Sequence, residues 1–220
     1  MDRKNKLKES LLSFFHNLFD LMVVNWLWLL CSLPVITIGP ATCAMYTVTL
    51  KLARDEATNP AKDFFLGLKS NIKTGILLEL ICLLPVIVAL GDVWFALQQT
   101  GMLQSLYLAL TAIAAMIFLI LLSYTFALQA MFENTLKQQV FNAFKLAAVA
   151  PGKTIGIWLI LLIPVIAALI LPPVALQMLG FLYLVAGISG PAYGASRILR
   201  NIFDRVNGEA MKDEPPTSEE

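Results

Sequence analysis

Few side chains in the apolar stretches of this chain could do chemistry. Glu79 is the one charged residue well inside such a stretch, and an ionisable group there is costly and therefore a candidate for function. The polar residues that could join it in one aqueous cavity are Asn25, Gln129 and Gln177. We favour structural roles: Glu79 hydrated at a membrane boundary or paired with a basic loop residue, and Asn25 bonded across helices, worth about 1 kcal/mol.

The parts of a catalytic or metal centre are missing from the sequence. The chain has one histidine, His16, and three cysteines whose spacing fits neither a zinc site nor a disulfide framework: Cys31, Cys43 and Cys82. It contains no phosphate-binding Gly-x-x-x-x-Gly-Lys, no His-Glu-x-x-His and no Gly-x-Ser-x-Gly. The sequence therefore predicts no enzyme activity, no metal and no cofactor.

The composition is typical of a membrane protein. Of the 220 residues, 58% are hydrophobic and 14% are charged, whereas soluble domains are about half apolar and about a quarter charged. Several nearly uncharged runs are long enough to cross about 30 Å of hydrocarbon. The net charge of +1 gives no basic field for nucleic acid, so we expect the lipid bilayer, and no nucleic acid, as a partner.

The alternation of apolar and polar stretches predicts an all-α, polytopic fold. We expect six membrane helices arranged as three hairpins, at about 18–54, 73–132 and 154–197. If the first apolar region forms one span instead of a hairpin, the count falls to five.

Amphipathic segments should accompany these hairpins at the cytoplasmic surface. Helical spacing of apolar residues marks three of them, at 7–17, 61–72 and 133–153. Residues 1–206 are then expected to form a single helical membrane domain. The polar residues 207–220 are expected to be a disordered tail.

The positions of the basic residues predict the topology. All 16 Lys and Arg residues fall in four regions, 1–17, 51–73, 133–153 and 197–212. Cytoplasmic loops of membrane proteins are enriched in these residues, and three hairpins place all four regions on one side. We therefore expect a multi-pass protein whose N- and C-termini are both cytoplasmic.

Proline and glycine residues mark the expected helix breaks. The first hairpin should bend on the extracytoplasmic side at 33–41, which contains Pro34, Gly39 and Pro40. Further breaks are expected at Pro85, Pro164, Gly190 and Pro191. The triplet Pro-Val-Ile begins at Pro34, Pro85 and Pro164, which indicates a threefold internal repeat, although short apolar matches also arise by chance.

A charged cluster closes the second apolar run and is a candidate docking site. Its members are Lys51, Arg54, Asp55 and Glu56. On a continuing helix Lys51 and Asp55 would be i, i+4 neighbours and would form a surface ion pair. The alternative to docking is that the cluster only anchors the helix at the membrane boundary.

Residues 26–56 carry a resemblance to a known family. The stretch Trp28-Leu-Leu-Cys-Ser-Leu-Pro-Val-Ile-Thr-Ile-Gly-Pro-Ala-Thr42, followed by Lys51-Leu-Ala-Arg-Asp-Glu56, resembles the N-terminal signature of the YesL-type family. These are bacterial integral membrane proteins classed as a domain of unknown function, so the resemblance implies a bacterial cytoplasmic membrane protein but no catalytic residue. Members often occur beside genes for ATP-driven carbohydrate importers, which implies a role in carbohydrate uptake.

Two hypotheses for function follow. The first is an accessory or partner-binding membrane protein without catalytic machinery, whose partner is a carbohydrate importer permease or a second copy of the chain. The second is a small-solute transporter or channel, which requires that Asn25, Glu79, Gln129 and Gln177 line one aqueous cavity.

Overall fold

The computed structural model describes residues 3–132 and 134–213, and these form helices joined by short loops, without a β-strand among them. Four helices are long and apolar enough to cross a membrane, and the number rises to six if two bent helix pairs each count as one span. The all-α, polytopic architecture is therefore confirmed.

The first hairpin consists of α1 (Arg3–Cys31) and α2 (Ile38–Ala53), joined by a turn that includes the 3-10 helix η1 (Val35–Thr37). The break at Pro34 is confirmed, so the first apolar region is a hairpin and not one span. Gly39 and Pro40 already lie in the first turn of α2, where proline is tolerated because the first helical N–H groups have no partner within the helix.

The second hairpin consists of α3 (Pro60–Ala96) and α4 (Met102–Met131). Asn59 caps α3, because its side chain accepts a hydrogen bond from the Lys62 backbone N–H. The prediction of a break at Pro85 is wrong, since α3 continues through it. α3 tolerates the loss of one backbone hydrogen bond at Pro85, because its other turns are intact and it packs along α4.

The remaining helices are α5 (Leu136–Val149), α6 (Pro151–Ile170), α7 (Pro173–Ala186) and α8 (Ser189–Asp213). α5 begins with a capping box between Thr135 and Gln138 and is bent by 107° from α6. The predicted break at Pro164 is absent, because α6 runs through it. The predicted kink at Gly190 and Pro191 lies earlier: α7 ends at Ala186, and both residues are in the first turn of α8, which is bent by 60° from α7.

Three further expectations change in the structure. The amphipathic segments 7–17 and 61–72 are not separate helices but continue into the apolar parts of α1 and α3. α8 extends to Asp213, past the expected start of the tail at 207, while residues 214–220 lie outside the described residues. The three Pro-Val-Ile triplets do not share a conformation, because the first lies in the turn around η1 and the others lie within helices.

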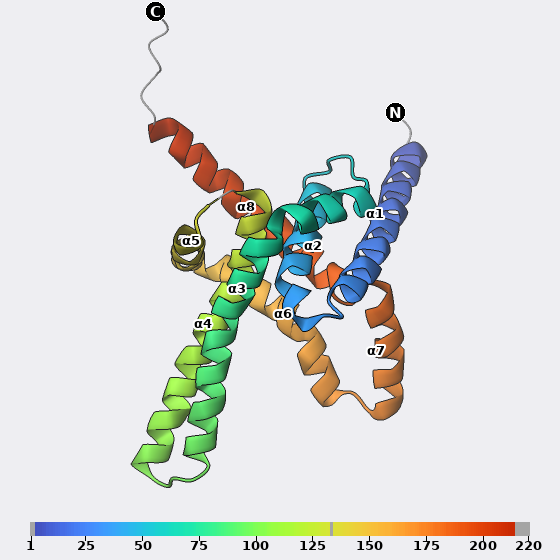
Figure 1. Ribbon diagram of the computed structural model, residues 1–220. Coiled ribbons are helices and arrows are strands. Elements are labelled where there is room, and N and C mark those ends of the chain that lie inside the picture. Colours follow the sequence, from blue (N-terminus) through green and yellow to red (C-terminus); the bar gives the residue numbers. More distant parts are fainter. Residues whose placement is uncertain (1–2, 133, 214–220) are drawn as a thin grey trace, which may run out of the picture.

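α2 lies at the centre of the fold, between α1, α3, α4 and α8 (Figure 1). Its buried residues are mostly small or apolar, and they join the main hydrophobic core with residues of α3, α4 and α8. α3 and α4 run side by side away from this centre as a long arm, and α6 and α7 form a second arm that diverges from it (Figure 1).

Candidate functional site

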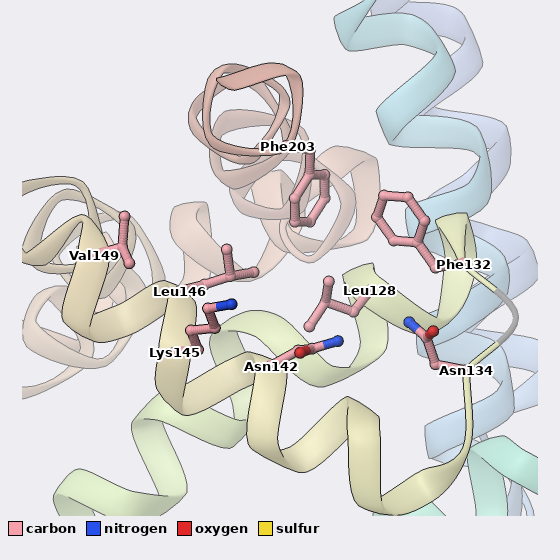
Figure 2. Close-up of a pocket in the computed structure, with 8 residues that line it drawn as sticks. All are labelled: Leu128, Phe132, Asn134, Asn142, Lys145, Leu146, Val149 and Phe203. Carbon is pink, nitrogen blue, oxygen red and sulfur yellow. The ribbon is translucent and has the colours of Figure 1, made fainter. Parts of the chain in front are cut away.

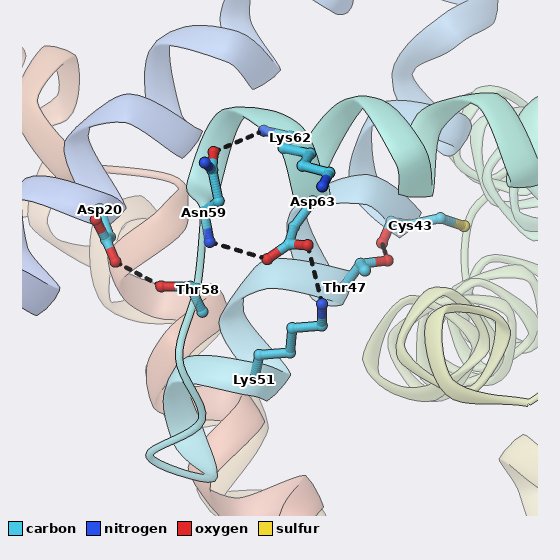
Figure 3. Close-up of polar contacts among 8 residues, drawn as sticks. All are labelled: Asp20, Cys43, Thr47, Lys51, Thr58, Asn59, Lys62 and Asp63. Carbon is cyan, nitrogen blue, oxygen red and sulfur yellow. Dashed lines mark hydrogen bonds and ion pairs between the residues drawn. The ribbon is translucent and has the colours of Figure 1, made fainter.

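The charged cluster at the end of α2 is held by ion pairs to other helices. α2 ends at Ala53, and Asp55 has φ 57°, so Lys51 and Asp55 do not share a helix face as predicted. Lys51 Nζ instead lies 2.9 Å from Asp63 Oδ1, as Figure 3 shows, and Asp63 Oδ2 accepts a hydrogen bond from the Asn59 backbone N–H at 3.1 Å. Lys51 thus fastens the end of α2 to the start of α3.

Two arginines extend this network to α8. Arg54 Nη2 lies 3.1 Å from Asp204 Oδ1. Arg200 Nη1 lies 3.9 Å from Asp55 Oδ2 and donates a hydrogen bond to the Ala53 carbonyl. Exposed ion pairs contribute only about 0–1 kcal/mol each, so the network orients the loop more than it stabilises the fold.

The loop between α2 and α3 is also anchored to α1. The Thr58 hydroxyl donates a hydrogen bond to Asp20 Oδ2 at 2.6 Å (Figure 3), and Asp20 is almost fully buried. His16 Nδ1 lies 3.5 Å from the same carboxylate oxygen. The loop is therefore held from three sides, by α1, α3 and α8.

A polar cavity of about 470 Å³ opens between α1 and this loop. His16 and Asn17 contribute from α1, and Asp55 and Glu56 contribute two exposed carboxylates from the loop. Among residues 12–132 and 134–204, Glu56 has no ion-pair partner. Of the four residues of the predicted docking cluster, Asp55 and Glu56 thus line this cavity, while Lys51, Arg54 and also Asp55 are paired with residues of other helices.

Glu79 caps the start of α2. Its Oε2 accepts a hydrogen bond from the Gly39 backbone N–H at 2.9 Å, and so satisfies one of the N–H groups that a helix start leaves without a partner. The carboxylate also interacts favourably with the positive end of the helix dipole. The expected pairing with a basic loop residue is not formed, because Glu79 lies beside the turn of the first hairpin.

Close contact between α2 and α3 brings Glu79 to this place. A Cβ atom added to Gly75 would lie 2.7 Å from the Cα of Pro40, a distance that real Cβ atoms do not adopt. One α-helical turn separates Gly75 from Glu79, so the two residues face α2 together. The absence of a side chain at Gly75 lets the helices approach closely enough for the Glu79 carboxylate to reach the Gly39 amide.

Asn25 joins the two halves of the broken segment α7–α8. Its Nδ2 donates to the carbonyls of Tyr183 and Leu184 at 3.0 and 3.1 Å, and its Oδ1 accepts from the N–H groups of Ile188 and Ser189 at 3.0 and 3.2 Å. The side chain is completely buried, and one amide thus binds both free ends of the broken helix. The bonds cross between helices as expected, although the partners are backbone groups.

Gln129 belongs to a third polar cluster, near the end of α4. Its Nε2 donates to Asn71 Oδ1 at 2.9 Å, and its Oε1 accepts from Gln139 Nε2 at 2.8 Å. Asn71 and Gln129 also line a cavity of about 500 Å³ that includes Thr135. No structural role was predicted for Asn71 or Gln139, although a polar residue among the apolar residues of an amphipathic segment is a usable signal.

Gln177 lies apart from the other three candidate residues. Its side chain is exposed on α7, and no hydrogen bond joins it to another of the described residues. Asn25, Glu79, Gln129 and Gln177 therefore lie in four different surroundings: the α7–α8 break, the start of α2, the end of α4 and the surface of α7. The structure does not bring them together in one cavity.

A small apolar cavity of about 190 Å³ lies between α4, α5 and α8 (Figure 2). Phe132 and Phe203 contact each other edge to face, with ring centroids 5.7 Å apart, and form one side of it. Asn134, Asn142 and Lys145 supply its polar atoms. Among the described residues, no three His, Cys, Asp or Glu side chains are placed together as metal ligands.

Comparison with known proteins gives one match. Residues 21–93 match the family model described as "Protein of unknown function, DUF624". The matched range includes the end of α1, all of α2, the Glu79–Gly39 contact and most of α3. No curated protein and no solved structure matches the chain.

Proposed function

We propose that this protein is a non-enzymatic accessory component of the bacterial cytoplasmic membrane, which binds a partner complex on the side of its basic loops. The observation that carries the proposal is the use made of the intramembrane polar groups. Asn25 and Glu79 satisfy helix ends, and Gln129 joins Asn71 and Gln139, so these groups hold helices together, which supports an accessory role over transport.

The cavity lined by His16, Asp55 and Glu56 is the binding surface that best suits a partner. Its two carboxylates are exposed, and the loop that carries them is fixed by contacts to α1, α3 and α8, so little ordering is needed when a partner binds. Exposed carboxylates select a partner with basic groups and mainly increase the rate of encounter. The partner we propose is a carbohydrate importer permease, because residues 26–56 resemble the YesL-type family.

Photo-crosslinking at Glu56 in the native host tests this proposal. A photoreactive amino acid at Glu56 should give a crosslink to one permease subunit, and the same amino acid at Thr100, in the loop between α3 and α4, should not. Reversal of charge by Asp55→Lys and Glu56→Lys should abolish the crosslink formed from Ser13, which lines the same cavity. Crosslinks of equal yield from Glu56 and Thr100, or none from Glu56, would contradict a partner site at this loop.

One observation favours the second candidate, a small-solute transporter. Discontinuous helices often line substrate sites in transporters, and α7–α8 is broken at the point that Asn25 binds. In that case purified protein should move solute across liposomes, and Asn25→Leu should reduce the flux more than Gln177→Leu. Solute flux that depends on Asn25 would replace the accessory role by transport.

A further inference from the structure

We propose that the turn of the first hairpin inserts into the acyl chains of the leaflet on the side of the basic loops and does not cross the membrane. The surface concerned consists of Leu33, Pro34, Val35 and Ile36, and the partner that covers it is lipid. This inference is independent of the proposed function.

The part of the hairpin beyond Asp20 and Lys51 is too short to cross, although the helical stretches Leu12–Cys31 and Val35–Ala53, which include these two charged residues, are each long and apolar enough for a span. The open end of the hairpin is marked by Asp20 on α1, which accepts a hydrogen bond from Thr58 of the α2–α3 connection, and by Lys51 on α2, which pairs with Asp63 at the start of α3. At about 1.5 Å per residue, Asp20 lies about 20 Å from Leu33 and Lys51 lies about 18 Å from Gly39. The hydrocarbon core is about 30 Å thick, so a hairpin of this reach ends within it.

α3 provides an internal comparison of length. Between Lys73 and Asp92 the helix rises about 28 Å and contains one charged residue, Glu79. Glu79 contacts the start of α2, and α3 then continues for about 25 Å to Ala96. The end of the α3–α4 arm therefore lies well beyond the turn of the first hairpin, as the different reach of the two hairpins shows in Figure 1.

The two turns also differ in chemistry. The arm ends in Gln98, Gln99 and Thr100, below an aromatic group in which Phe95 lies between Trp94 and Tyr107, with ring centroids 4.9 and 5.7 Å apart. Aromatic residues next to a polar loop are typical of a membrane–water interface. The turn of the first hairpin has no charged residue, and Leu33, Val35 and Ile36 are 76%, 70% and 59% exposed.

Part of the backbone of the turn is bonded within the protein, and the N–H groups of Val35 and Ile36 are left without a protein partner among the described residues. The Thr37 hydroxyl lies 2.5 Å from the Cys31 carbonyl and 2.6 Å from the Pro34 carbonyl, the Thr37 N–H donates to Pro34 at 2.8 Å, and Glu79 accepts from Gly39. A backbone group without a partner in hydrocarbon costs several kcal/mol, whereas in water no such contacts are needed. If the turn is inserted, the Glu79 side chain replaces water as the hydrogen-bond acceptor for the Gly39 N–H at the start of α2.

Spin-label accessibility tests the insertion. A nitroxide at Val35→Cys, in a variant with Cys31→Ala, Cys43→Ala and Cys82→Ala, is measured in nanodiscs of phosphatidylethanolamine and phosphatidylglycerol; the control label is at Thr100→Cys. At residue 35 we expect collisions with oxygen to exceed those with a water-soluble nickel chelate, and the reverse at residue 100. Nickel accessibility at residue 35 equal to that at residue 100 would show a turn in water, and shielding from both reagents would show a turn covered by protein; either result overturns the proposal.

The wild-type chain gives a second measurement if the cysteine-free variant does not fold. Cys43 and Cys82 are buried, and Cys31, at the end of α1 beside the turn, is the partly accessible thiol. A membrane-impermeant maleimide should fail to label Cys31 in intact cells and in inverted vesicles. Labelling from either side would place the turn in water and overturn the proposal.

Discussion

α2 and the α3–α4 arm are both apolar helical regions, yet they have opposite surroundings. In the most apolar stretch of α2, 61% of the residues are buried inside the protein, against 11% in α3 and 11% in α4. The side chains explain this difference. α2 is rich in small and hydroxyl-bearing residues such as Ala41, Ala44 and Thr49, whereas the arm exposes Leu84, Ile87 and Leu90.

An apolar helix in a membrane protein can therefore either pack against other helices or face lipid. The size and polarity of its side chains distinguish the two cases. Small residues let helices approach each other closely, and polar side chains bond across the contact, as Thr49 does with Ser196 at 2.9 Å. Large aliphatic side chains on the arm gain little from helix packing, because lipid tails solvate them equally well. α2 is thus the region on which the fold depends.

The largest effect should come from a matched pair of leucines on α3. Leu78 is completely buried beside α2, and Leu84 is 60% exposed on the arm. Leu78→Ala leaves a cavity and should cost about 2–5 kcal/mol. Leu84→Ala leaves none and should change the apparent Tm in mild detergent only slightly. Equal losses of Tm in the two variants would remove the distinction between the two regions.

The next effect concerns close contact between helices. Gly75→Ala places a Cβ 2.7 Å from the Pro40 backbone, so α2 and α3 must separate, at a cost of about 1–3 kcal/mol. Gly91→Ala, in the same helix, meets no atom within 4 Å and should be neutral or stabilising, because alanine favours helix by about 1 kcal/mol. Thermal unfolding in detergent measures both variants, and a Gly75→Ala protein as stable as wild type would contradict the contact.

A third comparison separates buried from exposed polar groups. Asn25→Leu removes the partners of two carbonyls and two N–H groups at the α7–α8 break and should cost about 1–3 kcal/mol. Gln177→Leu, on the exposed surface of α7, serves as the control and should leave stability unchanged. Limited proteolysis of reconstituted protein should show faster cleavage near Gly187 only in the Asn25 variant.

The smallest expected effect is at Glu79. Glu79→Gln keeps an oxygen that can accept from the Gly39 N–H but removes the charge at the start of α2, at a cost of about 0.3–1 kcal/mol. Glu79→Leu also removes the acceptor and should reduce the apparent Tm further. If the Gln variant were as unstable as the Leu variant, the charge would matter more than the hydrogen bond.

Local pattern predicted most of the helices and the first two hairpins, because these depend on neighbouring residues. The run of apolar residues in α4 and the break at Pro34 are examples. Predicted helix breaks at proline were wrong where neighbouring turns and a packed partner helix maintain the helix, as at Pro85. Charge distribution predicts the side of each loop but does not predict the depth of a hairpin, because a hairpin returns the chain to the side it left whether or not it crosses.

The candidate site was predictable in its residue types and not in its contacts. Asn25 and Glu79 stood out because polar groups are costly in apolar helices. Their partners lie far away in the sequence, at Ile188 and Gly39, and no local pattern connects such pairs. The predicted pair between Lys51 and Asp55 does not form, because Asp55 adopts a left-handed backbone conformation with positive φ and Lys51 pairs with Asp63. The helical pattern of the sequence does not signal this change of backbone conformation.

The most direct test of the proposed function is recovery of partners from the native host. Tagged wild-type protein and the Asp55→Lys, Glu56→Lys variant are purified in a gentle detergent from cells grown on glycans, and bound proteins are quantified by mass spectrometry. We predict that an importer permease is recovered in stoichiometric amount with the wild type and lost with the variant, while the variant, which also loses the exposed Asp55–Arg200 ion pair, has only a slightly lower Tm. Recovery of the chain alone, as a monomer or a self-assembled oligomer, would contradict the accessory role.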